Sequence, residues 1–161
     1  MPATWAINSP RTAGPEGWWQ SLRAFLPVSA VSALNGETAA AVPHLVRALP
    51  MALDAGTTGH VLEGVWVAAA RAAQQGRMED AATLLAGAAR HADPPGISGL
   101  ALYRDCREQA EQATLASGQS LEQAMLRGQT LTLDELVGVA GTVLRGPEIQ
   151  SGARPRPSQL K

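Results

Sequence analysis

A histidine and a glutamate in this sequence have the spacing of a general acid–base pair. His60 and Glu63 are three residues apart, so in a helix their side chains lie on one face. Trp66 follows at the same interval and places an aromatic wall beside them. Such a pair can pass a proton to or from a bound molecule. The same residues also fit an ordinary helix start, in which Glu63 binds a neighbouring backbone group or an arginine.

A second candidate site consists of aromatic side chains in the first half of the chain. Trp18, Trp19 and Phe25 precede Trp66, and all four lie in segments with helical spacing. If the first and third helices are neighbours, their rings can line one groove for a bulky apolar ligand or a partner helix. Core filling is the alternative. Adjacent residues differ by about 100° around a helix, so we expect Trp18 or Trp19 to be partly exposed.

The remaining reactive residue types do not form a recognisable site. His44, His60 and His91 lack the spacing of metal ligands, so we expect no metal and no cofactor. Cys106 is the single cysteine, which excludes an internal disulfide. It lies in a predicted helix without a nearby histidine, and we expect it to face the core or its margin.

Composition argues against several classes of protein. The net charge is −1, and the 13 basic residues form no stripe along a helix, so we expect no nucleic-acid binding by this chain alone. The first fifteen residues lack the charged start and apolar run of a signal peptide. No apolar run is long enough to span a membrane. We therefore expect no membrane association and a cytoplasmic location.

Helices must position the candidate residues, since β-branched runs with period-two alternation are almost absent. Apolar spacing and glycine or proline breaks predict an all-α chain of about seven helices. Gly128 is expected to end the sixth helix, and Gly146 with Pro147 the seventh. Thr132 and Glu135 have the spacing of a capping box at the start of the seventh. The expected ranges are 16–34, 37–53, 60–75, 78–91, 98–117, 120–126 and 132–144.

Two segments repeat each other at an interval of forty residues. The pattern is Gly36, Ala41, Leu45 and Ala48 in the first copy and Gly76, Ala81, Leu85 and Ala88 in the second. This predicts antiparallel hairpins in a tetratricopeptide-like right-handed stack. Two units are fewer than an array usually needs, so other helices or a second chain must cap them. We expect a disordered lead-in over 1–15, one helical-repeat domain over 16–145 and a disordered basic tail over 146–161.

Half of the chain resembles a known family. The matching features are Leu62-Glu63, Gly76-Arg77, the alanine–leucine helix over 81–88 and the turn over 128–135. They resemble the C-terminal tetratricopeptide-like domain of LuxR-type ATP-binding transcriptional regulators and related antibiotic-regulatory proteins. The resemblance implies a sensing or interaction module and transfers no catalytic residue. The chain has neither the nucleotide-binding loop nor the helix-turn-helix reader of those regulators.

These observations leave three functional hypotheses open. The leading one is a non-catalytic module, derived from a regulator, that binds a protein partner or a bulky apolar small molecule. The alternative is a small enzyme of natural-product metabolism, such as a cyclase or isomerase, with His60 and Glu63 as acid–base groups in an apolar pocket walled by Trp66. The third is a self-associating scaffold, in which a homodimer covers the exposed tryptophan.

Overall fold

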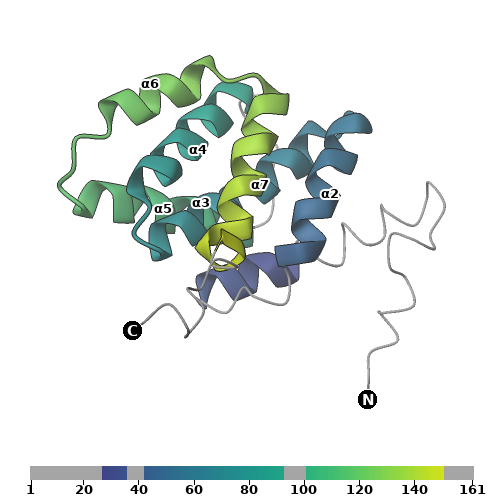
Figure 1. Ribbon diagram of the computed structural model, residues 1–161, viewed down its shortest axis with the longest axis horizontal. Coiled ribbons are helices and arrows are strands. Elements are labelled where there is room, and N and C mark those ends of the chain that lie inside the picture. Colours follow the sequence, from purple (N-terminus) through teal and green to yellow (C-terminus); the bar gives the residue numbers. More distant parts are fainter. Residues whose placement is uncertain (1–26, 36–41, 93–100, 151–161) are drawn as a thin grey trace, which may run out of the picture.

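The computed structural model describes residues 27–35, 42–92 and 101–150 (Figure 1). All regular structure in these ranges is helical, and no strand occurs among them, which confirms the predicted all-α class. A helix over 27–34 comes first. It is followed by α2 (Val42–Asp54), α3 (Thr58–Gln74), α4 (Met78–His91), α5 (Ala101–Ala116), α6 (Glu122–Thr130) and α7 (Leu133–Gln150).

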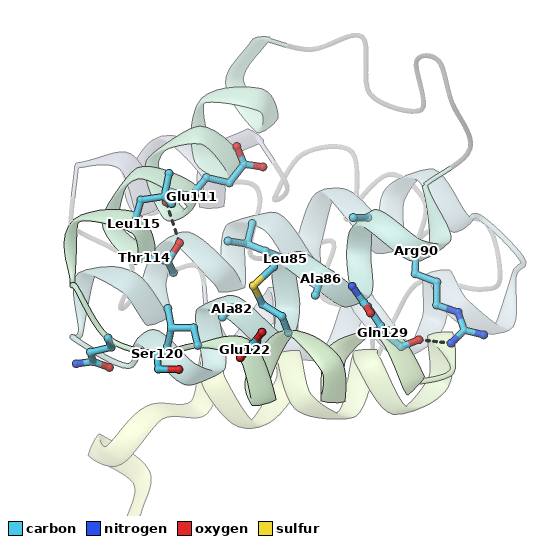
Figure 2. A pocket seen from close by; sticks show the side chains of 14 residues that line it. Ala82, Leu85, Ala86, Arg90, Glu111, Thr114, Leu115, Ser120, Glu122 and Gln129 are labelled. Carbon is cyan, nitrogen blue, oxygen red and sulfur yellow. Dashed lines mark hydrogen bonds between the residues drawn. The ribbon is translucent and has the colours of Figure 1, made fainter.

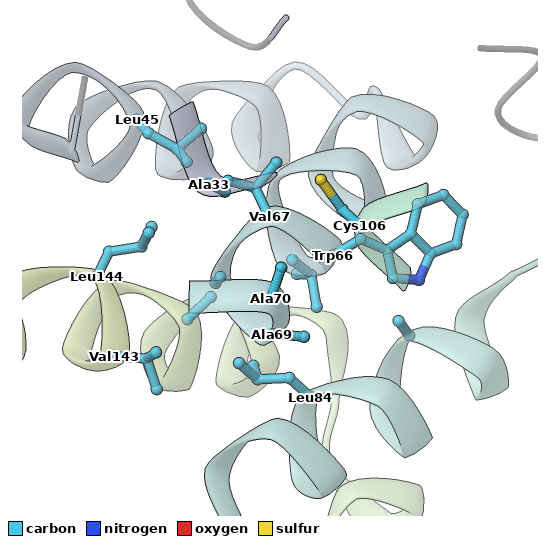
Figure 3. Packing of buried hydrophobic residues seen from close by; sticks show 14 of the residues in the cluster. Ala33, Leu45, Trp66, Val67, Ala69, Ala70, Leu84, Cys106, Val143 and Leu144 are labelled. Atoms are coloured by element: carbon cyan, nitrogen blue, oxygen red, sulfur yellow. The ribbon is translucent and has the colours of Figure 1, made fainter. Parts of the chain in front are cut away.

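Helix α3 forms the centre of the molecule. Every residue from Val61 to Ala73 is buried, because α2, α4, α5 and α7 all pack around this helix. Alanines make up much of this stretch and allow neighbouring helices to come close. Figure 3 shows Ala69 and Ala70 with Leu84 of α4 and Val143 of α7 close by. Burial of this apolar surface is the main force that holds the helices together.

Helices α4 and α6 run parallel, and the residues that join them are about forty positions apart in the sequence. The Thr83 hydroxyl, which is 2.8 Å from the Glu79 carbonyl oxygen of its own helix, also lies 3.2 Å from the Ala124 carbonyl oxygen of α6. At the end of α4, His91 Nε2 donates to the Leu131 carbonyl oxygen at 2.9 Å. Because the residue numbers rise together, α6 occupies the place beside α4 that a repeat of this length predicts.

Helices α3 and α5 are parallel in the same way. The Arg107 guanidinium lies 5.7 Å from the centre of the Trp66 ring. Gln74, eight residues after Trp66, donates through Nε2 to Oε1 of Gln109, which follows Arg107 by two residues, at 3.2 Å. Gln74 also donates to the Ala33 carbonyl oxygen, so the helix over 27–34 lies beside the end of α3.

Helices that follow each other in the sequence are not all packed against each other. Helices α3 and α4 form a closely packed hairpin, whereas α5 and α6 hardly touch each other. Helix α7 then returns against α2, α3 and α4, and Figure 1 shows it between α2 and α4. The parallel pairs agree with repeated hairpins, while the tetratricopeptide-like right-handed stack stays a prediction.

Several predicted boundaries are confirmed. Helix α4 covers the range predicted for it. Gly76 ends α3 with φ of 74°, a conformation that glycine adopts without a steric penalty, and the Arg77 N–H donates to the Ala72 carbonyl oxygen at 2.9 Å. The capping box of α7 is also present. The Thr132 N–H donates to Glu135 Oε2 at 2.8 Å, and the Glu135 N–H donates to Thr132 Oγ1 at 3.2 Å.

One predicted helix end is wrong, and another is confirmed. Helix α6 continues through Gly128 to Thr130, because this glycine lies against α4, where a Cβ atom would collide with the Thr83 carbonyl oxygen. The predicted break after Leu144 is confirmed: Gly146 has φ of 62° and ψ of 178°, which are not helical values, and a second helical stretch follows to Gln150. The predictions for residues 1–26, 37–41, 98–100 and 151–161 lie outside the described residues.

Candidate functional site

The predicted acid–base pair exists as a short contact in the first turns of α3. His60 Nδ1 lies 2.9 Å from Glu63 Oε2, so the two side chains share one face of the helix as their spacing predicts. The Glu63 side chain is only 9 % exposed, whereas that of His60 is 30 % exposed. The carboxylate is therefore largely shielded from water, and the imidazole covers its accessible side.

The surroundings of this pair are closely packed. Tyr103 of α5 is fully buried near Glu63. Its burial raises the pKa of the phenol, and the neighbouring Glu63 charge raises it further, so Tyr103 remains protonated. Trp66 is also buried, and Arg107 covers its ring in a cation–π contact. Glu63 thus lies near Tyr103 at the α3–α5 interface, and the partly exposed His60 lies beside it.

The aromatic candidates are only partly described. Trp18, Trp19 and Phe25 lie outside the described residues. Trp66 belongs to the hydrophobic core (Figure 3).

Cys106 lies in the core, as its position in the sequence predicts. Its side chain is fully buried, with Sγ 3.7 Å from the Ala30 carbonyl oxygen. Burial, together with the charge of Asp105, raises the pKa of the thiol to about 11. The thiolate is the nucleophilic form of cysteine, so at neutral pH this residue is held in its unreactive form.

A large open groove lies between α4, α5 and α6 (Figure 2). It encloses about 1030 Å³ and exists because α5 and α6 diverge while both remain attached to the α3–α4 hairpin. Its lining combines alanines, larger apolar side chains and a polar rim. The lining residues are Ala82, Leu85, Ala86, Ala89, Arg90, Glu111, Thr114, Leu115, Gln119, Ser120, Leu121, Glu122, Met125 and Gln129.

The floor and walls of the groove differ in character. Ala82, Ala86 and Ala89 recur at helical spacing along α4, and Leu85 lies among them, so the floor combines three small side chains with one leucine. Leu115 projects from α5 on one side, and Met125 projects from α6 on the other. Leu115 is 83 % exposed and Met125 is 48 % exposed. Exposed apolar side chains gathered beside a hollow are typical of a binding surface.

Charges of opposite sign occupy different parts of the rim. Arg90 lies where α4 ends, and its guanidinium donates to the Gln129 carbonyl oxygen of α6. Glu122 lies at the start of α6, well away from Arg90, and Glu111 lies on α5 (Figure 2). Glu111 is 3.6 Å from Arg107, a loose pair at the surface. The groove rim therefore carries one basic residue, Arg90, and two acidic residues that lie apart, Glu111 on α5 and Glu122 on α6.

The sequence predictions did not include the groove. A signal for it was present, because the forty-residue pattern continues: Leu45 and Leu85 are followed by Met125, and Ala48 and Ala88 by Gly128. This third copy lies in α6, which was predicted to end before Gly128. The register identifies Met125 as a position that is apolar in all three units.

Comparisons with other proteins do not assign a role to the groove. Within ranges 27–35, 42–92 and 101–150, no three His, Cys, Asp or Glu side chains are grouped so as to hold a metal ion. None of the helices in that part of the chain has the length and apolar character needed to cross a membrane. No protein-family model, curated protein or solved structure matches the chain. Function has to be inferred from the chemistry of the site itself.

Proposed function

We propose that this protein is a non-catalytic helical-repeat interaction module and that the α4–α5–α6 groove is its binding surface. The groove itself is the observation that carries the proposal. It places an apolar hollow beside two exposed apolar side chains, Leu115 and Met125. Removal of such surface from water favours binding by about 25 cal/mol per Å². A partner helix or a bulky apolar small molecule is the occupant that this surface suits.

The dimensions of the groove support this class of partner. Its volume of about 1030 Å³ is at the upper end of the range for small-molecule sites. An open groove whose floor is mostly alanine also accepts a helix, whose diameter with side chains is about 10–12 Å. Met125 adds a flexible side chain that can adapt to different apolar shapes.

The regulator resemblance is consistent with a module that binds rather than reacts, and it stays a prediction. So do the cytoplasmic location and the absence of nucleic-acid and membrane partners. The proposal depends on none of these expectations. It depends on the groove, which the packing of α4, α5 and α6 creates.

The enzyme alternative has one observation in its favour, the 2.9 Å contact between His60 and Glu63. Neither residue lines the groove, and Glu63 is almost inaccessible. If the chain does catalyse a reaction through this pair, Glu63→Gln should slow turnover at least about tenfold, the low end of general acid–base effects. Unchanged turnover in that variant would eliminate the alternative.

The binding proposal is tested by filling the groove from within. Ala89→Trp places a large side chain on the groove floor, and Gln112→Trp places the same side chain at an exposed α5 position outside the lining. Two probes represent the two partner classes: 8-anilinonaphthalene-1-sulfonate and a synthetic amphipathic helical peptide of about three turns. Binding to the folded state raises the melting temperature by mass action.

We expect at least one probe to raise the melting temperature of the wild type and of Gln112→Trp. The same probe should have little effect on Ala89→Trp, which must melt without probe within a few degrees of the wild type. If neither probe stabilises the wild type at a protein concentration at which the chain is monomeric, or if Ala89→Trp responds as strongly as Gln112→Trp, the groove is not the binding surface.

A further inference from the structure

Helix α6 is unusually exposed to solvent for a helix in a packed domain. It contacts α4 mainly through the side that carries Ala124 and Gly128, and most of its other residues are exposed. Leu126 is 58 % exposed beside the half-exposed Met125. One face of the protein therefore carries the groove and, next to it, an apolar ridge formed by Met125 and Leu126. The groove is wide enough to accept a ridge of this kind.

The rim charges are arranged on both sides of Met125. Glu122 precedes it by three residues, or about 4.5 Å along the helix axis. Arg90 contacts the carbonyl oxygen of Gln129, which follows Met125 by four residues, or about 6 Å. An acidic and a basic group thus lie at similar distances from Met125 in opposite directions. A surface with this pattern is complementary to a copy of itself turned by 180°.

We infer that the occupant of the groove is α6 of a second copy of this chain, in a homodimer with a two-fold axis near Met125. The two α6 helices lie antiparallel, and each enters the groove of the other copy. Leu126 of each copy then contacts Leu115 of the other, and Glu122 of each copy faces Arg90 of the other. The inference rests on the proposed function, since it assigns a partner to the same groove.

The symmetry explains why groove and ridge occur on one face. In a two-fold interface each copy presents the same patch, so the patch must supply both the concave and the convex element. Burial of Leu115, Met125 and Leu126 supplies the driving force. The two Arg90–Glu122 contacts at the rim fix the antiparallel orientation, because a parallel arrangement would place like charges opposite each other.

Sedimentation velocity of the full chain between about 1 and 200 µM tests the dimer directly. Leu115→Glu should raise the dimer dissociation constant at least about tenfold, since it places a charge in the apolar contact. Val28→Glu is the matched control: Val28 is a 54 % exposed valine on the helix over 27–34, outside the groove. Both side chains are exposed in the single chain, so neither substitution should unfold it.

Charge reversal tests the register. Arg90→Glu and Glu122→Arg should each weaken dimerisation, because each brings like charges together across the interface. The double variant restores opposite charges and should recover a dissociation constant within about threefold of the wild type. A double variant as weak as its parents would contradict the antiparallel arrangement, provided that its melting temperature matches theirs.

The outcomes separate this inference from the proposed function. A chain that remains monomeric over the whole range overturns the dimer, and so does a dimer that Leu115→Glu leaves intact. If the monomer still binds the anilinonaphthalene dye or the amphipathic peptide in the groove, the interaction module stands and its partner is a different molecule. If the monomer binds neither probe, both the dimer and the proposed function are contradicted.

Discussion

Individual residues show how burial decides what a reactive side chain can do. His60 and Glu63 have the spacing of an acid–base pair and do meet, yet the Glu63 carboxylate is almost completely buried and close enough to Tyr103 for its charge to raise the pKa of that phenol. Cys106 is a potential nucleophile by type, but its burial holds it as a neutral thiol. The sequence predicts that both residues lie in helices. It does not predict how far water and ligands can reach their side chains, because that depends on how α5 packs against its neighbours.

Burial of Cys106 predicts that the protein loses stability in alkali. The pKa of this thiol is about 11 in the fold, against 9.0 for an unperturbed thiol. Between these values the unfolded chain has released its proton and the folded chain has kept it, so the free energy of unfolding falls as the pH rises. The raised pKa of Tyr103 acts in the same direction above pH 10. Below pH 9 the full contribution is present.

Urea denaturation at several pH values from 7 to 11 measures this effect. We expect a decline that begins near pH 9, and Cys106→Ala should show a shallower decline because one of the two titrating groups is gone. A free energy of unfolding that is constant or rises over this range would contradict the burial of both groups.

At the scale of helices, the contact between α4 and α6 depends on the absence of side chains. The backbone of Gly128 lies against the Thr83 carbonyl oxygen, and a Cβ atom on Gly87 of α4 would lie only 3.3 Å from the Gly128 carbonyl oxygen. A glycine after a short apolar segment predicts a helix end from sequence alone. Gly128 serves here as a contact residue because α4 lies against it. The spacing of apolar residues along the sequence does not predict where α4 lies.

Gly128→Ala should therefore destabilise the protein although alanine is the better helix former. The added methyl group collides with backbone atoms of α4, and such overpacking costs about 1–3 kcal/mol. Gly138→Ala is the control: its Cβ would have no atom within 4 Å on the exposed side of α7, so it should gain up to about 1 kcal/mol. Thermal unfolding compares the two variants. A Gly128→Ala protein as stable as Gly138→Ala would contradict the α4–α6 contact.

For the molecule as a whole, the sequence predicts the list of helices better than their arrangement. The all-α class, the range of α4 and the capping box at Thr132 all follow from local spacing, and the structure confirms them. The divergence of α5 and α6 does not follow in this way, because it results from the attachment of each to a different helix of the α3–α4 hairpin. The third unit of the forty-residue repeat becomes clear only when α6 is seen beside α4.

The whole arrangement also explains why one face is available for binding. Helix α7 packs against α2, α3 and α4 and closes that side of the molecule. Nothing in the described part of the chain covers the opposite side, where α5 and α6 diverge over the alanines of α4 (Figures 1 and 2). The predicted tryptophan groove cannot account for this face, since Trp66 lies in the core and does not line it.

The central claim is that two copies of this protein meet at the α4–α5–α6 groove. Methyl NMR spectra of the full chain, recorded over a dilution series in the low to high micromolar range, test it most directly. We expect concentration-dependent shifts at Ala89, Leu115 and Met125, and unchanged signals at Val28 and Val31 on the helix over 27–34. Shifts that centre on those two valines, or that leave the three groove methyl groups unaffected, would contradict the claim.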